Sequence, residues 1–197
     1  MKKSTIAILL ASTLAMSEHQ AALAGNRPGA ITFTPGVGYV DFASKRQIRD
    51  TAAIPLLGLA YNFDSKWAIE VAYSPLHTRF STSDGGQVVG NLSTLDGLYR
   101  FFHYGMFEPY ASAGMGVLYL NPNGNSSTNQ ADLNVGLGTQ VFFAESIALR
   151  GEVRDLYTMS GGKNDVMFDM GVSFLFLGDT PSASPVSYKD EIYRGDK

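Results

Sequence analysis

The 197-residue sequence contains no cysteine and only three histidines. Without cysteine the chain cannot form disulfide bonds, thiolate metal sites or a lipid anchor on an N-terminal cysteine. Basic residues are also in deficit, because 15 Lys and Arg accompany 18 Asp and Glu. This negative balance argues against a nucleic-acid partner.

Long apolar runs are lacking as well. After residue 24 no stretch approaches 18 consecutive apolar residues, so no transmembrane helix is expected. A mean hydropathy of −0.02 would ordinarily suggest a water-soluble protein. Strands that alternate lipid-facing and lumen-facing residues also average to neutral hydropathy, so the alternation of residues has to be examined.

Residues 1–24 have the features of a secretory signal peptide. Lys2 and Lys3 precede an apolar run over residues 6–16, and Ala22 and Ala24 supply small residues for a signal peptidase. The run is too short to span ~30 Å of hydrocarbon at about 1.5 Å per residue. We therefore expect export by the Sec pathway and a mature chain that begins near Gly25.

The last regular stretch, residues 166–176, alternates strictly between two kinds of side chain. Side chains two residues apart share a face of a strand. The bulky face consists of Phe168, Met170, Val172, Phe174 and Phe176. The other face consists of Met167, Asp169, Gly171, Ser173 and Leu175. One face suits lipid and the other a tight, partly polar interior, which is typical of the closing strand of a membrane barrel.

Seven further runs have the same period, and turn residues separate them. The eight predicted strands are residues 31–42, 52–63, 67–74, 88–102, 109–120, 131–143, 147–157 and 166–176. An even number allows a closed, all-β, eight-stranded antiparallel up-and-down transmembrane β-barrel over residues 25–177. Residues 178–197, rich in Pro, Ser and charge, are expected to be a short disordered periplasmic tail.

The connections are predicted to alternate between short periplasmic turns and longer extracellular loops. The predicted outer loops are residues 43–51, 75–87, 121–130 and 158–164. This places His77 in an outer loop and His103 in a periplasmic turn, on opposite sides of the membrane. No Ser-His-acid site can use both, so the sequence predicts no enzyme, and no cofactor or metal is expected.

Charged residues of both signs are predicted to face the barrel interior. Eight strands enclose only enough space for side chains, so we expect a packed polar network rather than an open channel, with a gated ion path as the alternative. The predicted interior charge network is Glu70, Asp96, Arg100, Arg150, Glu152, Arg154 and Asp169.

Five segments together resemble the OmpA-like outer-membrane barrel family. They are KWAIEVAY, EPYASAGMGV, NVGLGTQVFF, IALRGEVRDLYT and DVMFDMGVSFLF, in the order and spacing of that family. The resemblance implies a salt-bridged eight-stranded barrel in the bacterial outer membrane, in contact with lipid and lipopolysaccharide. It also implies insertion by the barrel assembly machinery with periplasmic chaperones. Asp169, Gly171, Phe174 and Phe176 resemble the C-terminal signal that this machinery recognises.

Full-length relatives continue into a peptidoglycan-binding domain, which the 20 residues from Gly178 to Lys197 are too few to form. The expected function is therefore a small structural or surface-interaction barrel acting through its extracellular loops, whose ligand the sequence does not identify. The alternative is a narrow pore or carrier for small solutes or hydrophobic compounds, as in OmpW-like barrels. A lipid A-modifying enzyme is the third hypothesis.

We predict that Asp169→Lys, or truncation before Phe174, blocks assembly into the outer membrane, because both changes remove the terminal signal. Gel mobility with and without heating measures assembly, since a folded barrel migrates differently from the unfolded chain. Normal heat-modifiable insertion of the truncated protein would contradict the assignment.

Overall fold

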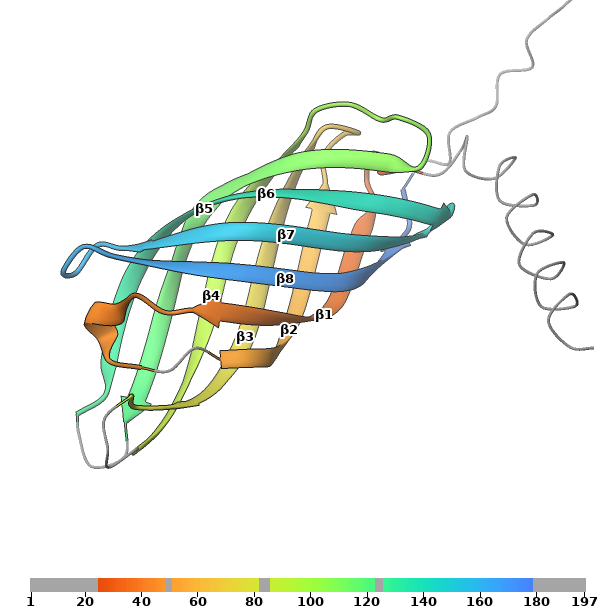
Figure 1. Cartoon of the computed structure of the whole chain (residues 1–197). Helices are drawn as coiled ribbons and strands as arrows, with labels where there is room; N and C mark the ends of the chain where they lie inside the picture. Colours follow the sequence, from red (N-terminus) through yellow and green to blue (C-terminus); the bar gives the residue numbers. More distant parts are fainter. Residues whose placement is uncertain (1–24, 49–50, 82–85, 123–125, 179–197) are drawn as a thin grey trace, which may run out of the picture.

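The computed structural model describes residues 25–48, 51–81, 86–122 and 126–178. Consecutive strands pair antiparallel, and β1 pairs with β8 to close a barrel (Figure 1). A 3-10 turn, η1 (Ser44–Arg46), lies between the first two strands. The strands are β1 (Ile31–Asp41), β2 (Thr51–Asn62), β3 (Trp67–Arg79), β4 (Gln87–Arg100), β5 (Phe107–Pro122), β6 (Thr128–Ala144), β7 (Ile147–Thr158) and β8 (Lys163–Phe176). The predicted eight-stranded antiparallel barrel is confirmed.

Three predicted outer loops, 75–87, 121–130 and 158–164, are shorter than expected, because the strands that flank them are longer. β3 continues to Arg79, so the first five residues of the predicted loop 75–87 are strand. His77 was placed in that loop, and this placement was wrong, since His77 pairs with Val89 of β4. Beyond the bilayer the outer face of a strand meets water instead of lipid and carries polar residues, so the contrast in the sequence fades while the backbone ladder continues.

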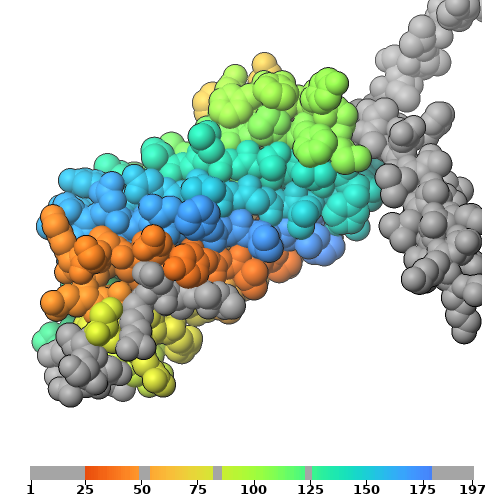
Figure 2. All heavy atoms as spheres, viewed as in Figure 1, coloured from red at the N-terminus to blue at the C-terminus, as the bar shows by residue number. Residues whose placement is uncertain are grey.

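The predicted alternation between the two faces is confirmed along β8. The side chains of Met167 and Ser173 are buried in the lumen, whereas Phe168 and Met170 are 47% and 62% exposed on the outer wall. Side chains of β6, β7, β8 and β1 cover the outer face seen in Figure 2. The outer wall is thus apolar where it meets lipid.

Aromatic rings gather on the outer wall near the short turns. Trp67 of β3 and Tyr99 of β4 have ring centroids 4.7 Å apart, and Phe101 lies 5.7 Å from Tyr99 in an edge-on arrangement. Aromatic girdles of this kind mark the boundary between hydrocarbon and head groups in barrels. The rings mark this end as one of the two interfaces, and its short turns indicate the periplasmic one.

The turn between β2 and β3 is held by one carboxylate. Asp64 accepts hydrogen bonds from the backbone N–H groups of Lys66 (2.6 Å) and Trp67 (2.7 Å). These two bonds stabilise the ionised carboxyl group and lower the pKa of Asp64. The same bonds fix the tight reversal before β3 begins.

The interior is divided into an apolar outer part and a polar inner part. The apolar part is one cluster of buried side chains that point inward from the outer halves of the strands: Val40, Phe42, Ile48, Ile54, Leu56, Ala72, Leu76, Val88, Leu92, Leu118, Leu120, Leu156 and Met167. The expectation of a polar network throughout the lumen was therefore too broad. Leucines that face the lumen recur every second residue, just as leucines that face lipid do. Alternation alone therefore does not tell an apolar lumen face from a lipid face.

Leu137→Arg should lower the free energy of unfolding by about 2–4 kcal/mol, because it places a charge near the middle of the lipid-facing wall. Leu137 is 64% exposed and central in β6. Urea unfolding in lipid vesicles measures the change. Ser160→Arg, in the exposed β7–β8 turn, is the control and should leave stability within about 0.5 kcal/mol of the unmodified protein. Equal stability of the two variants would place Leu137 outside the hydrocarbon.

Candidate functional site

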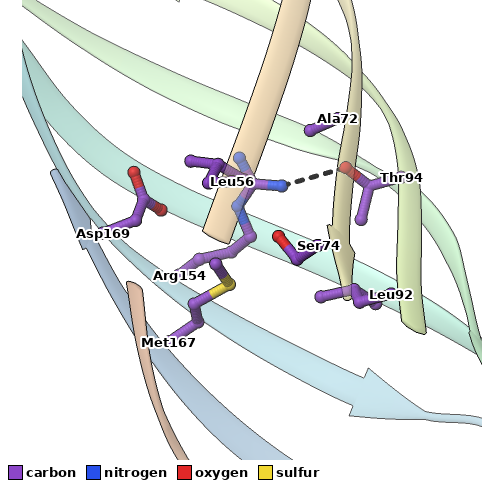
Figure 3. Close-up of a pocket in the computed structure, with 8 residues that line it drawn as sticks. All are labelled: Leu56, Ala72, Ser74, Leu92, Thr94, Arg154, Met167 and Asp169. Atoms are coloured by element: carbon purple, nitrogen blue, oxygen red, sulfur yellow. Dashed lines mark hydrogen bonds between the residues drawn. The ribbon is translucent and has the colours of Figure 1, made fainter. Parts of the chain in front are cut away.

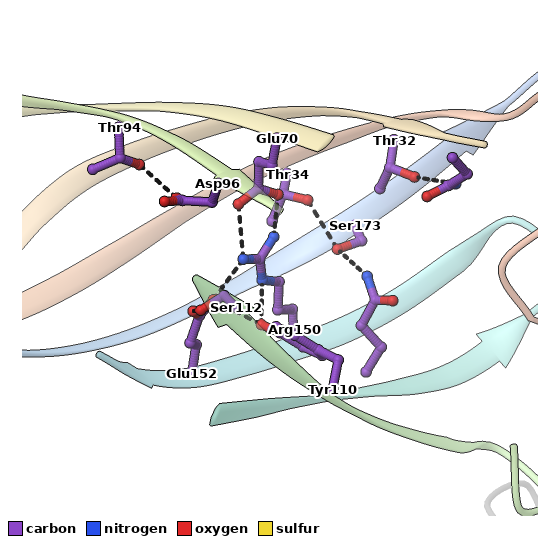
Figure 4. A network of polar contacts seen from close by, with 12 residues as sticks. Thr32, Thr34, Glu70, Thr94, Asp96, Tyr110, Ser112, Arg150, Glu152 and Ser173 are labelled. Atoms are coloured by element: carbon purple, nitrogen blue, oxygen red, sulfur yellow. Dashed lines mark hydrogen bonds and ion pairs between the residues drawn. The ribbon is translucent and has the colours of Figure 1, made fainter. Parts of the chain in front are cut away.

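Arg150 is the centre of the polar part of the lumen (Figure 4). Its guanidinium forms a two-pronged ion pair with Glu70 across the barrel and donates a 2.6 Å hydrogen bond to Glu152. Its Nε donates to the hydroxyl of Tyr110 at 2.7 Å. These bonds join β3, β5 and β7, so one side chain cross-links three strands. All four groups are buried.

Glu152 links this centre to a second ion pair formed by Arg154. Arg154 donates to Asp96 of β4 at 2.7 Å and to Glu152 at 3.1 Å. The remaining bonds of Glu152 come from Ser112, at 2.5 Å, and from Tyr110, at 2.8 Å. Charge-assisted bonds of this kind offset the cost of burying ionised groups.

Asp169 points into the lumen but takes no part in these pairs (Figure 3). It lines a small cavity of about 10 Å³ together with Arg154, Thr94 and Ser74. The cavity has room for about one water molecule. Nε of Arg154 has no hydrogen-bond partner among the described residues, so the cavity contains an unused donor.

Glycines on β6 provide the space that the network occupies. A Cβ atom on Gly136 would lie 2.5 Å from Oε1 of Glu152 and would also collide with Ser112. A Cβ atom on Gly138 would collide with the ring of Tyr110. The inward glycines of this strand are therefore required by the bulk of the side chains that face them.

The periplasmic end of the lumen is closed by a segment that precedes β1, which the sequence did not predict. Asn26 donates from its side chain to Glu108 and to Gln140, both at 2.5 Å. Arg27 donates to the carbonyl of Leu177 at 3.0 Å and to Ser146 at 3.1 Å. The segment thereby ties the start of the barrel to its last strand.

The outer end is closed by Arg46, which the sequence placed in an exposed loop. η1 turns its guanidinium inward, where it pairs with Asp165 of β8 at 2.7 Å and donates to Thr158 and Gln130 at 2.5 Å each. Asp165 also accepts from the backbone N–H of Ala43 at 2.8 Å. A single arginine in a polar loop carries no periodic signal, so only the tertiary structure reveals this contact.

The predicted interior residues all lie in the lumen, but they do not form one network. Arg100 donates to Asn62 at 2.8 Å and approaches Glu108 at 3.8 Å, apart from the Arg150 and Arg154 pairs. Asp169 stands alone beside its cavity. Glu70, Asp96, Arg150, Glu152 and Arg154 form the connected group. The assembly role of Asp169, Gly171, Phe174 and Phe176 stays a prediction.

The two histidines in the described part of the chain form no hydrogen bond or ion pair with the Arg150 and Arg154 pairs. His77 is exposed on the outer end of β3, and His103 contacts Glu108 at 3.0 Å at the periplasmic rim. Among the described residues no group of three or more acidic and histidine side chains could hold a metal ion. No helix in the described part of the chain is long and apolar enough to cross a membrane.

The fold defines a small outer-membrane β-barrel with an apolar wall and a lumen occupied by side chains. The sequence matches the OprF membrane domain over residues 1–180, and the chain belongs to that family. The resemblance to OmpA-like outer-membrane barrels is thereby confirmed. A comparison with curated protein sequences gives no match.

Solved structures show the same fold at low sequence identity. The N-terminal β-barrel domain of Pseudomonas aeruginosa OprF is 21% identical, with a TM-score of 0.56, and the match covers 77% of this chain and 100% of that one. The outer membrane protein OprG from Pseudomonas aeruginosa is 16% identical, with a TM-score of 0.60 over 77% and 98% of the two chains. Neisserial surface protein A is 13% identical, with a TM-score of 0.56 over 75% and 96%.

Arg150→Met should lower the free energy of unfolding by about 3–5 kcal/mol, because it leaves the buried carboxylates of Glu70 and Glu152 without their shared cation. Equilibrium urea unfolding in vesicles measures the loss. Arg79→Met, at the exposed outer end of β3, removes the same charge from a solvated position and should change stability by about 0.5 kcal/mol or less. Similar losses in both variants would show that Arg150 does not stabilise the barrel.

Proposed function

We propose that this protein is a non-enzymatic outer-membrane barrel with a structural or surface-interaction role, exported by the Sec pathway and inserted by the barrel assembly machinery. The observation that supports this most is the filled lumen. Arg46 closes the outer end, an apolar cluster follows, the Arg150 group fills the next layer, and Asn26 closes the periplasmic end.

A filled lumen opposes conduction for two physical reasons. An ion that crosses the apolar layer would have to lose its hydration shell. The desolvation free energy is large, and the apolar side chains there offer no polar group to offset it. It would also have to displace Arg150 from Glu70 and Glu152, a change that leaves buried charges unpaired. The interior therefore serves stability rather than passage.

The described parts of two outer connections form a joined surface that a partner can contact. The first two extracellular connections are joined, because the backbone N–H of Ser81 donates to the carbonyl of Gln47 at 2.8 Å and Ile48 forms a bridge with Phe80. Arg46 joins the first connection to β8 through its ion pair with Asp165. A surface held in one shape loses little conformational entropy on binding, which favours a recognition role.

A narrow carrier of hydrophobic compounds is the second candidate, supported by the apolar character of the outer half of the lumen. Such a compound would have to displace the packed side chains of the cluster and move Arg46. Uptake into vesicles of a hydrophobic dye, compared with uptake of an ion, separates this role from an ion pore.

We expect planar bilayers that contain the purified, heat-modifiable protein to show no steady single-channel steps. The physical reason is the unbroken stack of side chains across the lumen. A reconstituted porin is the positive control for fusion with the bilayer. Steady steps whose number follows the amount of inserted protein would overturn the closed-barrel proposal and favour the pore. An acyl-chain mass shift of lipid A that depends on the protein would instead favour the enzyme.

A further inference from the structure

The described interior carries more buried negative charge than positive charge. Seven buried carboxylates are present: Glu70, Asp96, Glu108, Asp132, Glu152, Asp165 and Asp169. Five buried guanidiniums accompany them: Arg27, Arg46, Arg100, Arg150 and Arg154. A buried charge is costly unless an opposite charge lies beside it. The position of each carboxylate therefore decides whether it has a close cation.

Glu108 is the carboxylate at the periplasmic mouth without a close, permanent cation. Nε of Arg100 is 3.8 Å away, too far for a hydrogen bond, and Arg100 donates instead to Asn62 at 2.8 Å. His103 contacts Glu108 at 3.0 Å, but an imidazole, unlike a guanidinium, is not a permanent cation. Arg27 is directed away, toward Leu177 and Ser146.

The backbone of Gly25 lies against this carboxylate. A Cβ atom on Gly25 would be 2.9 Å from Oε1 of Glu108 and 3.4 Å from Cε1 of His103, so the backbone of Gly25 lies close to both side chains. The next backbone N–H, that of Asn26, donates to Oε1 of Glu108 at 3.2 Å. The hydrogen bonds of Asn26 and Arg27 hold the segment in this place.

We infer that processing after residue 24 converts the nitrogen of Gly25 into an α-ammonium group that forms an ion pair with Glu108. A signal peptidase adds water across the peptide bond between residues 24 and 25. The carbonyl carbon takes the hydroxyl and leaves as a carboxylate, and the nitrogen takes the protons and becomes a cation. The inference rests on the export part of the proposed function and is independent of whether the barrel conducts.

The ion pair makes the periplasmic closure depend on processing. In the unprocessed chain the nitrogen of Gly25 is a neutral amide, which adds no charge beside Glu108. In the processed chain a cation sits at the mouth, and the closing segment is held by charge as well as by the bonds of Asn26. Glu108 is thus a docking site for the newly formed N-terminus of the same chain.

The first test is the intact mass of the protein extracted from outer membranes. The mass should correspond to a chain that begins at Gly25, and a start at any other residue overturns the inference. This measurement concerns processing alone. It therefore separates failure of the inference from failure of the closed-barrel proposal, which bilayer conductance decides.

The second test compares the mature chain with a free α-amino group and the same chain acetylated at Gly25. Acetylation should lower the equilibrium constant for folding in vesicles at pH 7 by about tenfold to a hundredfold, the effect of losing a charged hydrogen bond. It should have no effect in Glu108→Gln. Glu145→Gln, an exposed carboxyl group in the β6–β7 turn at the same end, is the matched control and should respond like the unmodified protein.

An alanine inserted before Gly25 displaces the ammonium by about 3.8 Å and should cause a similar loss even if Glu108→Gln does not fold. The difference between free and acetylated chains should decrease as the pH rises from about 8 to about 10, because an α-amino group with a reference pKa of about 8 loses its proton through the higher pKa that the ion pair gives it. Equal stability of free, acetylated and extended chains at pH 7 would overturn the inference.

Discussion

A backbone that crosses hydrocarbon must satisfy every N–H and C=O group within the protein, since lipid offers no hydrogen-bond partner. Here the pairing of β1 with β8 meets that requirement by removing the last two free strand edges. Closure in turn fixes the size of the lumen, because eight strands leave a space that side chains fill. The buried ion pairs, the inward glycines and the closing segments are consequences of that narrow space.

The narrow lumen explains why single polar side chains each bind several others. Glu152 serves both Arg150 and Arg154, and Tyr110 bridges Arg150 and Glu152. Sharing lets few side chains satisfy many donors, and each shared group ties several strands together. Sharing also makes the stability of the barrel sensitive to substitution, because removing one partner leaves more than one buried charge uncompensated. The apolar outer layer has no such dependence and contributes by burial alone.

The two ends of the barrel are closed by different means. At the outer end an arginine in η1 is drawn down onto Asp165, and at the inner end the segment before β1 is folded beneath the strands. Both closures use residues outside the membrane strands, which have no periodic constraint on their sequence. They tie the first outer connection to β8 on one side and hold the segment before β1 against Glu108 on the other.

The period of two in the sequence was sufficient to predict the number of strands, their order and which face of each meets lipid, because alternation reflects the local geometry of an extended backbone. It also placed Glu70, Arg150 and Arg154 in the lumen. It was insufficient for the ends of β3 and for His77, since the contrast between faces vanishes outside the bilayer.

The partners of each charge were decided by the tertiary structure alone. Arg150 meets Glu70, 80 residues away in the chain, and Arg46 meets Asp165 at a separation of 119. Asp169, with the same pattern in the sequence, has no such partner and faces a cavity. Local periodicity fixes the direction of a side chain. Which group it reaches depends on the register and curvature of strands distant in sequence, and these arise only when the barrel closes.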